Sequence, residues 1–171
     1  MSGLPEGARA VVVTASNRAS AGVYPDRSGQ ALAEGLRGLG FAVEGPHVLP
    51  DDRAALAGAL RDAVASGADV VLTTGGTGLS PTDVTPEAPR DVLEREAPGI
   101  ADAVRRYGAP QVPTAVLSRG LAGTAGRTLI VNLPGSTGGV KDALAVLGPL
   151  LPHIVSQLRG GDHGGGVDSS A

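Results

Sequence analysis

The chain has 171 residues, of which 42% are hydrophobic, and this content is enough to close one sizeable core. Its formal net charge is −3 and its 14 basic residues are scattered, so no run of them could neutralise a row of phosphates on a nucleic acid. Aromatic residues make up only 2% of the chain, which argues against stacking on single-stranded bases. The absence of cysteine excludes disulfides, thiolate zinc sites and cysteine nucleophiles.

The N-terminus lacks the basic-then-apolar pattern of a signal peptide, and no apolar run approaches the roughly 18 residues of a membrane span. We therefore expect a cytoplasmic protein with neither a membrane nor a nucleic-acid partner. One domain is expected over residues 1–159. The glycine-rich tail over residues 160–171 should be disordered, because it has too few apolar groups to offset the entropy of ordering it.

The first half of the chain alternates between apolar runs and amphipathic segments. Three mostly apolar runs predict strands, at residues 9–14, 41–49 and 69–74. Leucines at helical spacing predict two helices between them, one over residues 30–39 and one that follows Asp51 and Asp52 and ends at Gly67. One aspartate of this pair is expected to cap the second helix.

The second half of the chain has a less regular pattern. A helix should begin at Thr85-Pro86-Glu87, with the threonine as its cap and the proline at its first position, and another should cover residues 98–106. Residues 115–118 and 128–132 are expected as strands joined by a looped or hairpin-like connection over residues 121–126. A last long helix is expected over residues 136–158, interrupted near Pro149 and Pro152.

This alternation of strands and helices predicts an α/β fold, a three-layer sandwich with a mostly parallel sheet between helices. In such sheets ligands bind outside the carboxyl ends of the strands, at the point where the strand order reverses. Each glycine-rich or polar loop that stands out in this sequence follows a predicted strand. We therefore expect the binding residues to gather at one end of the sheet.

The sharpest local signal is the loop that follows the third predicted strand. Thr74-Gly75-Gly76-Thr77-Gly78 places three glycines where backbone N–H groups could approach an anion closely. No Gly-Lys-Ser/Thr follows, so the loop is not a P-loop, and no helix opens directly after it, as the usual dinucleotide turn requires. The loop indicates either a phosphate-binding turn or a tight structural turn.

Carboxylates follow two of the predicted strands. Asp83 ends the glycine loop and would either cap the next helix or hold Mg²⁺ beside phosphates, and Asp51 or Asp52 follows the second strand. Proteins usually hold Mg²⁺ with one or two carboxylates plus substrate phosphates. The pattern therefore suits a magnesium and phosphate site, with helix capping as the alternative role of Asp83.

Three further loops place polar groups at the same end of the sheet. Residues 132–139 follow a strand and open a helix, where free N–H groups and the helix dipole favour a phosphate, although the same residues also make an ordinary loop and cap. Ser16-Asn17-Arg18 follows the first strand, and Ser118-Arg119 follows the predicted fourth strand. Each arginine would be either a ligand clamp or a solvated surface group.

Taken together, these motifs resemble the MogA/MoaB family over about residues 8–158. The motifs that carry the resemblance are Ser16-Asn17-Arg18 through Tyr24, Thr74 to Gly78, Asp83-Val84-Thr85-Pro86-Glu87-Ala88, Ser118-Arg119 and Asn132-Leu133-Pro134-Gly135. The resemblance extends in part to domains of gephyrin and of molybdenum-insertion enzymes. It implies a sheet between helices, a homotrimer and a pocket for molybdopterin. In the active branch of the family it implies that ATP and Mg²⁺ are used to adenylylate the terminal phosphate of molybdopterin, which releases pyrophosphate.

The resemblance also implies roles for individual residues. Asp51 and Asp83 would be the catalytic pair that holds Mg²⁺. The residues expected to bind molybdopterin or the nucleotide are Ser16, Arg18, Asp26, Ser28, Thr74, Gly75, Gly76, Thr77, Gly78, Ser118, Arg119, Asn132, Pro134, Gly135 and Ser136. The implied partners are the two substrates, further copies of the chain and a molybdenum-insertion enzyme. Apolar residues from Ala143 to Leu151 also favour a trimer.

One segment departs from the pattern of the family. Members often carry an arginine just before the second aspartate, whereas here the segment is Leu79-Ser80-Pro81-Thr82. A non-catalytic, MoaB-like protein that binds molybdopterin or acts in assembly is therefore the alternative function. Residues 83–87 and 132–135 match the active branch, so adenylyl transfer is our leading hypothesis.

Overall fold

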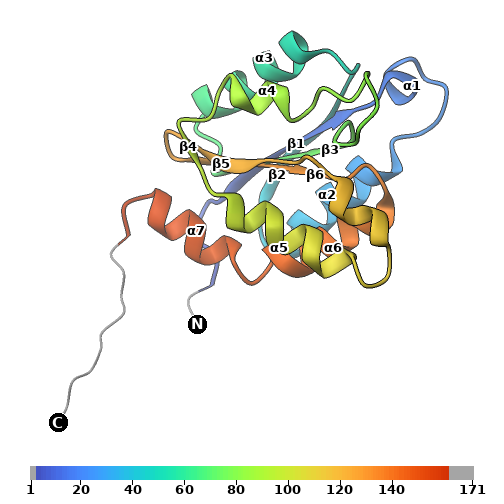
Figure 1. The fold of residues 1–171 in the computed structure, drawn as a ribbon. Helices are drawn as coiled ribbons and strands as arrows, with labels where there is room; N and C mark the ends of the chain where they lie inside the picture. Colours follow the sequence, from blue (N-terminus) through green and yellow to red (C-terminus); the bar gives the residue numbers. More distant parts are fainter. Residues whose placement is uncertain (1–2, 162–171) are drawn as a thin grey trace.

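Six strands form one sheet in the order β2-β1-β3-β6-β5-β4, as the computed structural model of the chain shows for residues 3–161 (Figure 1). The strands are β1 (Arg9–Ala15), β2 (Ala42–Leu49), β3 (Val70–Thr74), β4 (Arg95–Glu96), β5 (Ala122–Ala125) and β6 (Thr128–Leu133). The first three and β6 run parallel, whereas β5 pairs antiparallel with both β6 and β4. The predicted α/β sandwich with a mostly parallel sheet is confirmed.

Helices cover both faces of this sheet (Figure 1). They are α1 (Asn17–Ser20), α2 (Arg27–Gly38), α3 (Arg53–Ala65), α4 (Glu87–Arg90), α5 (Pro98–Gly108), α6 (Thr137–Leu147) and α7 (Leu151–Leu158), with a 3-10 helix η1 at Pro113–Leu117. On one face lie α3 and α4, and on the other lie α2, α5, α6 and α7. None of the helices within residues 3–161 has the length and apolar composition that a membrane span needs.

Alternating side chains of the central strands fill two separate cores, because successive residues of a strand point to opposite faces. Val12 of β1 packs with α2 and α6, whereas its neighbours Val11 and Val13 pack with α3. All three of these valines are at most 4% exposed. Both faces of the sheet are therefore apolar, which explains why β1, β3 and β6 have no polar alternation in the sequence.

The switch in strand order falls between β1 and β3. From β1 the chain moves through α2 to β2 on one side, and from β2 it crosses through α3 to β3 and later β6 on the other side. The loops that leave the carboxyl ends of β1 and β3 therefore diverge. This divergence opens the crevice that is expected to bind a ligand in such sheets.

Several predicted elements differ in the structure. The expected strand at residues 115–118 is the 3-10 helix η1, whose first position is Pro113, and the expected connection at residues 121–126 contains strand β5. The helix after Thr85 is a single turn whose N-cap is Pro86, with no side-chain cap. The short elements α1 and β4 were not predicted at all.

The remaining predicted elements are confirmed with small shifts of their ends. Helix α2 begins at Arg27, three residues earlier than predicted, because Asp26 caps it. The last helical stretch is interrupted, as expected, between α6 and α7 at residues 148–150. Residues 162–171 lie outside the described residues, so the predicted disorder of the tail is untested, as is the extent of the domain.

Candidate functional site

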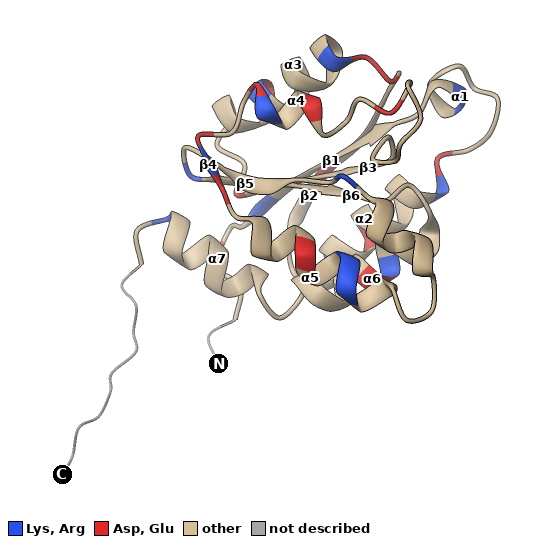
Figure 2. Ribbon diagram, viewed as in Figure 1, with Lys and Arg blue, Asp and Glu red and all other residues tan. Residues whose placement is uncertain are grey.

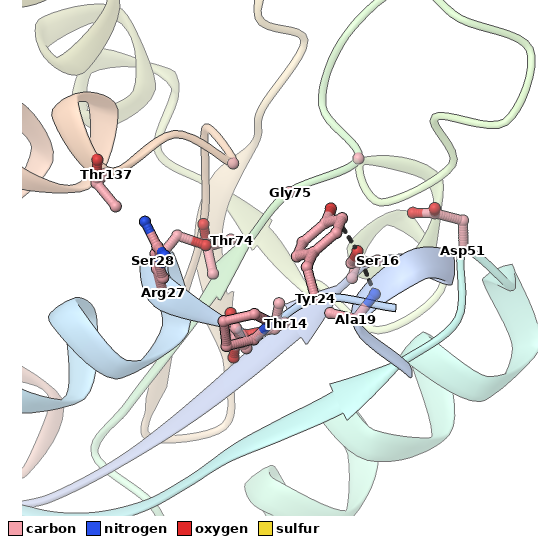
Figure 3. A pocket seen from close by; sticks show the side chains of 15 residues that line it. Thr14, Ser16, Ala19, Tyr24, Arg27, Ser28, Asp51, Thr74, Gly75 and Thr137 are labelled. Carbon is pink, nitrogen blue, oxygen red and sulfur yellow. Dashed lines mark hydrogen bonds between the residues drawn. The ribbon is translucent and has the colours of Figure 1, made fainter. Parts of the chain in front are cut away.

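A cavity of about 550 Å³ opens at the switch point between β1 and β3 (Figure 3). Its walls come from loops that follow four parallel strands and from the first turns of α2 and α6. We call it the first cavity. It is lined by Thr14, Ala15, Ser16, Ala19, Tyr24, Pro25, Asp26, Arg27, Ser28, Asp51, Thr74, Gly75, Gly76, Gly135 and Thr137.

The floor of the first cavity requires glycine at two positions. Gly75 and Gly76 have φ angles of +94° and +67°, a region that side chains disfavour. A Cβ atom on Gly75 would overlap the carbonyl oxygen of Ala15, and one on Gly76 would overlap the hydroxyl of Thr85. The turn after β3 therefore packs directly on the end of β1. Its tight geometry has a structural cause, and Gly75 is buried there with its amide bonded to the Leu133 carbonyl at 3.1 Å.

Helix α2 directs its first turn at the first cavity. Asp26 accepts hydrogen bonds from the Gly29 amide at 3.0 Å and from the Thr14 hydroxyl at 2.7 Å, which fixes the start of the helix against β1. Arg27 and Ser28 follow and line the cavity. The Arg27 amide donates to the Pro25 carbonyl and the Gly29 amide to Asp26, so the Arg27 guanidinium and the Ser28 hydroxyl are the groups of this turn that suit an anionic ligand.

Ser16 and Tyr24 form the wall opposite this turn. The Ser16 hydroxyl lies 3.2 Å from the Tyr24 hydroxyl and accepts a hydrogen bond of 3.1 Å from the Ala19 amide (Figure 3). Ser16 thus caps the short helix α1 and is held in place for contact with a ligand. The Tyr24 ring is 48% exposed, so it offers an open aromatic surface at the mouth of the cavity.

Two acidic loops approach each other at the rim, the loop before α3 and the loop before α4 (Figure 2). Burial raises the pKa of the Asp51 carboxyl above its ordinary value, a hydrogen bond with the Asn17 backbone lowers it, and the negative charge of Asp83 raises it again. The Asp51 amide donates a 2.8 Å bond to the Asn17 side chain. The fold therefore brings both predicted acidic residues close enough to interact, although Asp83 does not line the first cavity.

Asp51 and Thr85 carry buried oxygens with no hydrogen-bond partner. These are Asp51 Oδ1 and the Thr85 hydroxyl, and both lie beside Gly76. Thr85 is only 1% exposed. An unpartnered buried polar atom is costly, and these two oxygens, with the nearby Asp83 carboxylate, are the kind of ligands that a hard cation prefers. Residues 3–161 contain no cluster of three His, Cys, Asp or Glu residues that could hold a metal ion alone. Mg²⁺ at this donor set would need phosphate or water to complete its coordination.

A second cavity of about 820 Å³ lies on the other side of the glycine turn. Its walls are more apolar, with Tyr107, Val112 and Leu117 among them, and Lys141 and Asp142 add charge. The two cavities are neighbours along the chain, because residues 75–76 line the first and residues 77–78 line the second. The second cavity is lined by Thr77, Gly78, Tyr107, Gly108, Pro110, Gln111, Val112, Thr114, Ala115, Leu117, Ser118, Pro134, Ser136, Gly138, Gly139, Lys141 and Asp142.

The predicted site residues divide between these cavities. In the first cavity are Ser16, Asp26, Ser28, Asp51, Thr74, Gly75, Gly76 and Gly135. In the second cavity are Thr77, Gly78, Ser118, Pro134 and Ser136. Four predicted residues line neither cavity: Arg18, Asp83, Arg119 and Asn132.

These four residues have other positions. Arg18 is exposed on α1. Asn132 is 3% exposed and bonds to the Thr73 hydroxyl and the Leu121 amide, so it joins β6 to its neighbours. Asp83 accepts a 3.0 Å bond from the Ser80 amide and does not cap α4, so capping is excluded as its role.

Arg119 is held by protein groups. Its guanidinium donates to the carbonyl oxygens of Gly78 and Asp83 and to the Glu87 carboxylate. Burial acts to raise the pKa of Glu87, but the hydrogen bond and charge of Arg119 outweigh it and keep that pKa below its usual range. Arg119 is therefore paired with a carboxylate, and the prediction that it contacts a ligand directly finds no support in its geometry.

Several lining residues were missed in the sequence. Thr14 lies two positions before the motif that begins at Ser16, Thr137 lies within the motif of residues 132–139 but was not named as a binding residue, and Arg27 lies between two predicted residues. The rule that ligands meet strand ends and helix starts would have included them. The signal for Lys141 was weaker, since it lies one turn inside α6 and depends on the distant residues of η1 for its surroundings.

Comparison with known proteins identifies the family. Residues 11–153 match a family described as a probable molybdopterin binding domain. The chain belongs to this family. Its membership agrees with the strand-end loops described above, because the matched range contains every residue that lines the two cavities.

Relatives within the family cover most of this chain. A molybdopterin adenylyltransferase of Helicobacter pylori is 37% identical over 87% of the chain and 86% of its own length. The molybdopterin biosynthesis Mog protein of Mycobacterium ulcerans is 50% identical, with a TM-score of 0.85 over 89% of this chain and 99% of that one. A molybdenum cofactor biosynthesis bifunctional protein of Chlorobaculum tepidum is 37% identical, and here the chain spans only 50% of the relative's length.

Proposed function

We propose that the chain is a molybdopterin adenylyltransferase of molybdenum cofactor biosynthesis, which transfers AMP from ATP to the terminal phosphate of molybdopterin and releases pyrophosphate. The observation that carries the proposal is the pair of cavities that meet at one glycine turn, with two carboxylates at the rim. Such a site can hold two substrates with their reacting groups adjacent. The names of several relatives support the same activity.

The chemistry of the walls assigns the substrates to the cavities. The first cavity offers the Arg27 guanidinium and the hydroxyls of Ser16, Ser28 and Thr137, which together suit the phosphates of ATP. The second cavity is larger and has apolar and aromatic walls with a few polar groups, as a fused-ring ligand requires. We therefore place the triphosphate in the first cavity and the pterin in the second. The phosphate of the pterin then lies at their shared rim.

The reaction needs no protein nucleophile. An oxygen of the molybdopterin phosphate attacks the α-phosphorus of ATP, the bond from that phosphorus to the bridging oxygen breaks, and pyrophosphate leaves. Residues of the site contribute by positioning the two substrates and by offsetting negative charge. The Arg27 and Ser28 side chains would stabilise the phosphates, and the Gly75-Gly76 turn would fix the approach of the two reactants.

Asp51 and Thr85, with the nearby Asp83, are the residues that would hold Mg²⁺ beside the phosphates. When bound there, Mg²⁺ would offset the charge that develops on the phosphate oxygens. The raised pKa of Asp51 means that protons compete with a cation for this carboxylate as the pH falls. Binding of Mg²⁺ should therefore weaken toward acid pH.

The alternative function is a non-catalytic pterin-binding or assembly protein. It is favoured by the loop of residues 79–82, which contains no arginine. The test incubates the protein with molybdopterin, ATP and Mg²⁺, and measures adenylylated pterin and pyrophosphate by chromatography. Pterin binding without either product would favour the alternative function.

A matched pair of variants makes this test specific. Asp51→Asn should abolish most of the turnover, because the charge beside the glycine turn is lost. Asp52→Asn should leave turnover unchanged, because Asp52 points to the Ala55 amide as the cap of α3, and asparagine caps about as well as aspartate. Equal loss of activity in both variants would show that the effect is structural.

The assembly of the protein is a further part of the proposal. We propose a homotrimer that passes its product to a molybdenum-insertion enzyme in the cytoplasm. The apolar residues Ala143, Leu147 and Leu151, which favoured a trimer in the sequence, are buried in the core of their own chain and do not support it. Val116, within η1, is 59% exposed and lies outside both cavities, so it offers an apolar surface instead. Light scattering that detects only monomer at micromolar concentration would contradict the trimer.

A further inference from the structure

Arg119 holds the loop that carries Asp83. Its guanidinium Nε donates to the Gly78 carbonyl at 2.9 Å, and Nη2 donates to the Asp83 carbonyl at 2.7 Å. A third bond joins Nη1 to the Glu87 carboxylate at the end of the loop. The Arg119 amide also donates to the Thr77 carbonyl at 2.8 Å. Arg119 thus makes hydrogen bonds to four residues between positions 77 and 87, two of which, Gly78 and Asp83, are the ends of the loop of residues 78–83.

The loop has few other attachments. Within residues 78–83, the remaining side-chain and turn hydrogen bonds join members of the loop to one another, as between Ser80 and Asp83. Leu79 is 66% exposed and adds little packing. In the described part of the chain, Arg119 therefore supplies the hydrogen bonds that connect residues 78–83 to another segment. Arg119 therefore fixes the loop from outside, while Val84 packs on the core and the Thr85 amide bonds to the Gly76 carbonyl just beyond Asp83.

We propose that Arg119 is a positioning residue that holds the Asp83 carboxylate beside Asp51, and that it thereby sets the affinity of the site for Mg²⁺ and the rate of adenylyl transfer. This inference rests on the function proposed above. The proposed role of Arg119 differs from direct contact with a substrate, because Arg119 lines neither cavity and its charge is paired with Glu87.

The planar fork of arginine is essential to this role. Guanidinium groups present several donors in a fixed geometry, whereas lysine has one compact ammonium on a flexible stem. Lysine at position 119 would keep the positive charge and one bond, most simply to Glu87. It could not reach the Gly78 and Asp83 carbonyls at the same time.

The test compares Arg119→Lys with Arg159→Lys. Arg159 is a matched control because it also makes three side-chain bonds, to both oxygens of Asp69 and to the Glu6 carbonyl, at the amino ends of the strands, far from the site. Three properties are measured: Mn²⁺ affinity in the presence of ATP by electron paramagnetic resonance, hydrogen exchange of residues 78–83, and the kinetics of adenylylation.

For Arg119→Lys we expect faster exchange of the loop, Mn²⁺ affinity weakened about tenfold and kcat reduced by roughly 10²-fold, the scale for a displaced catalytic group. The KM for molybdopterin should stay within about twofold of wild type, since uniform substrate binding is not touched. Arg159→Lys should lower the melting temperature and leave all three properties unchanged.

Other outcomes would overturn the inference. A raised KM or weakened substrate binding with unchanged loop exchange would show that Arg119 contacts a substrate. Identical behaviour of the two lysine variants would show that Arg119 has only a structural role. If Arg119→Lys fails to fold, Glu87→Gln removes the charge that pairs with Arg119 and should give the same loop exchange and Mn²⁺ changes in weaker form; their absence would count against the proposal. If wild type makes no adenylylated pterin, the proposed function fails, while loop exchange and Mn²⁺ affinity still decide the role of Arg119.

Discussion

The substitution Thr85→Val tests whether the Thr85 hydroxyl is a ligand for a cation or an ordinary buried hydroxyl. The Thr85 hydroxyl is buried, has no hydrogen-bond partner and lies at the glycine turn near Asp51. Valine has almost the same shape, and it removes a group whose unpaired burial costs about 1–3 kcal/mol. The free energy of unfolding of the variant should therefore be about 1 kcal/mol higher than that of wild type. For a chain of this size, this difference raises the melting temperature by about 2–4 °C.

The same substitution should weaken cation binding. If Thr85 is a ligand of Mg²⁺, its loss should lower metal affinity in the ATP complex by about 10–100-fold, the scale seen when groups that support a metal site are removed. Calorimetry without ligands measures the first effect, and Mn²⁺ titration followed by electron paramagnetic resonance measures the second. A variant that is both more stable and weaker in metal binding is the expected result.

Thr128→Val is the matched control for this experiment. Thr128 is 2% exposed, but its hydroxyl donates a 2.6 Å bond to the Ala68 carbonyl at the opposite end of the sheet. Valine at 128 should therefore lower stability by about 1 kcal/mol and leave metal affinity unchanged. If Thr85→Val loses stability in the same way and binds Mn²⁺ normally, the Thr85 hydroxyl is structural and the reasoning is refuted.

Two further predictions concern charged groups. Asp83→Asn keeps an acceptor for the Ser80 amide, so folding and molybdopterin binding should be close to wild type while adenylylation falls by roughly two or more orders of magnitude, and full turnover at saturating Mg²⁺ would remove Asp83 from the mechanism. Burial acts to raise the pKa of Asp69, but its bonds with Arg159 and the Arg9 amide outweigh this and hold that pKa below its ordinary value. Its ionised form therefore stabilises the fold above about pH 4, and this contribution is lost as the pH falls further. Urea unfolding at several pH values should show a smaller acid dependence for Asp69→Asn, and equal slopes would contradict the assignment.

The sequence predicted the fold well wherever a pattern was long. β1 and β3 are buried on both faces and read as continuous apolar runs, and α2 and α3 have leucines at helical spacing. Short elements were less predictable, because their conformation depends on partners distant in sequence. The run at residues 115–118 resembled a strand, yet Pro113 begins a 3-10 helix there and β5 takes the neighbouring position in the sheet.

The rule that ligands meet the carboxyl ends of strands gathered most of the candidate residues correctly in space. Ser16, Asp51 and Thr74 come from three separate loops and line one cavity. The surroundings of Arg119 and Asn132 could not be predicted, since their hydrogen bonds join segments that are between 11 and 59 positions apart. The missing partner of the Thr85 hydroxyl is likewise a property of tertiary packing alone.

The two cavities share a boundary, and this arrangement indicates how an inhibitor of both could be designed. Residues 75–78 form one side of the boundary and residues 134–136 form the other, and each segment lines both cavities. A single compound that joins an adenosine phosphate to a pterin-like ring could therefore occupy both cavities over this boundary. Because the second half would bind at a high effective concentration, such a compound could bind about 10²–10⁴-fold more tightly than either half.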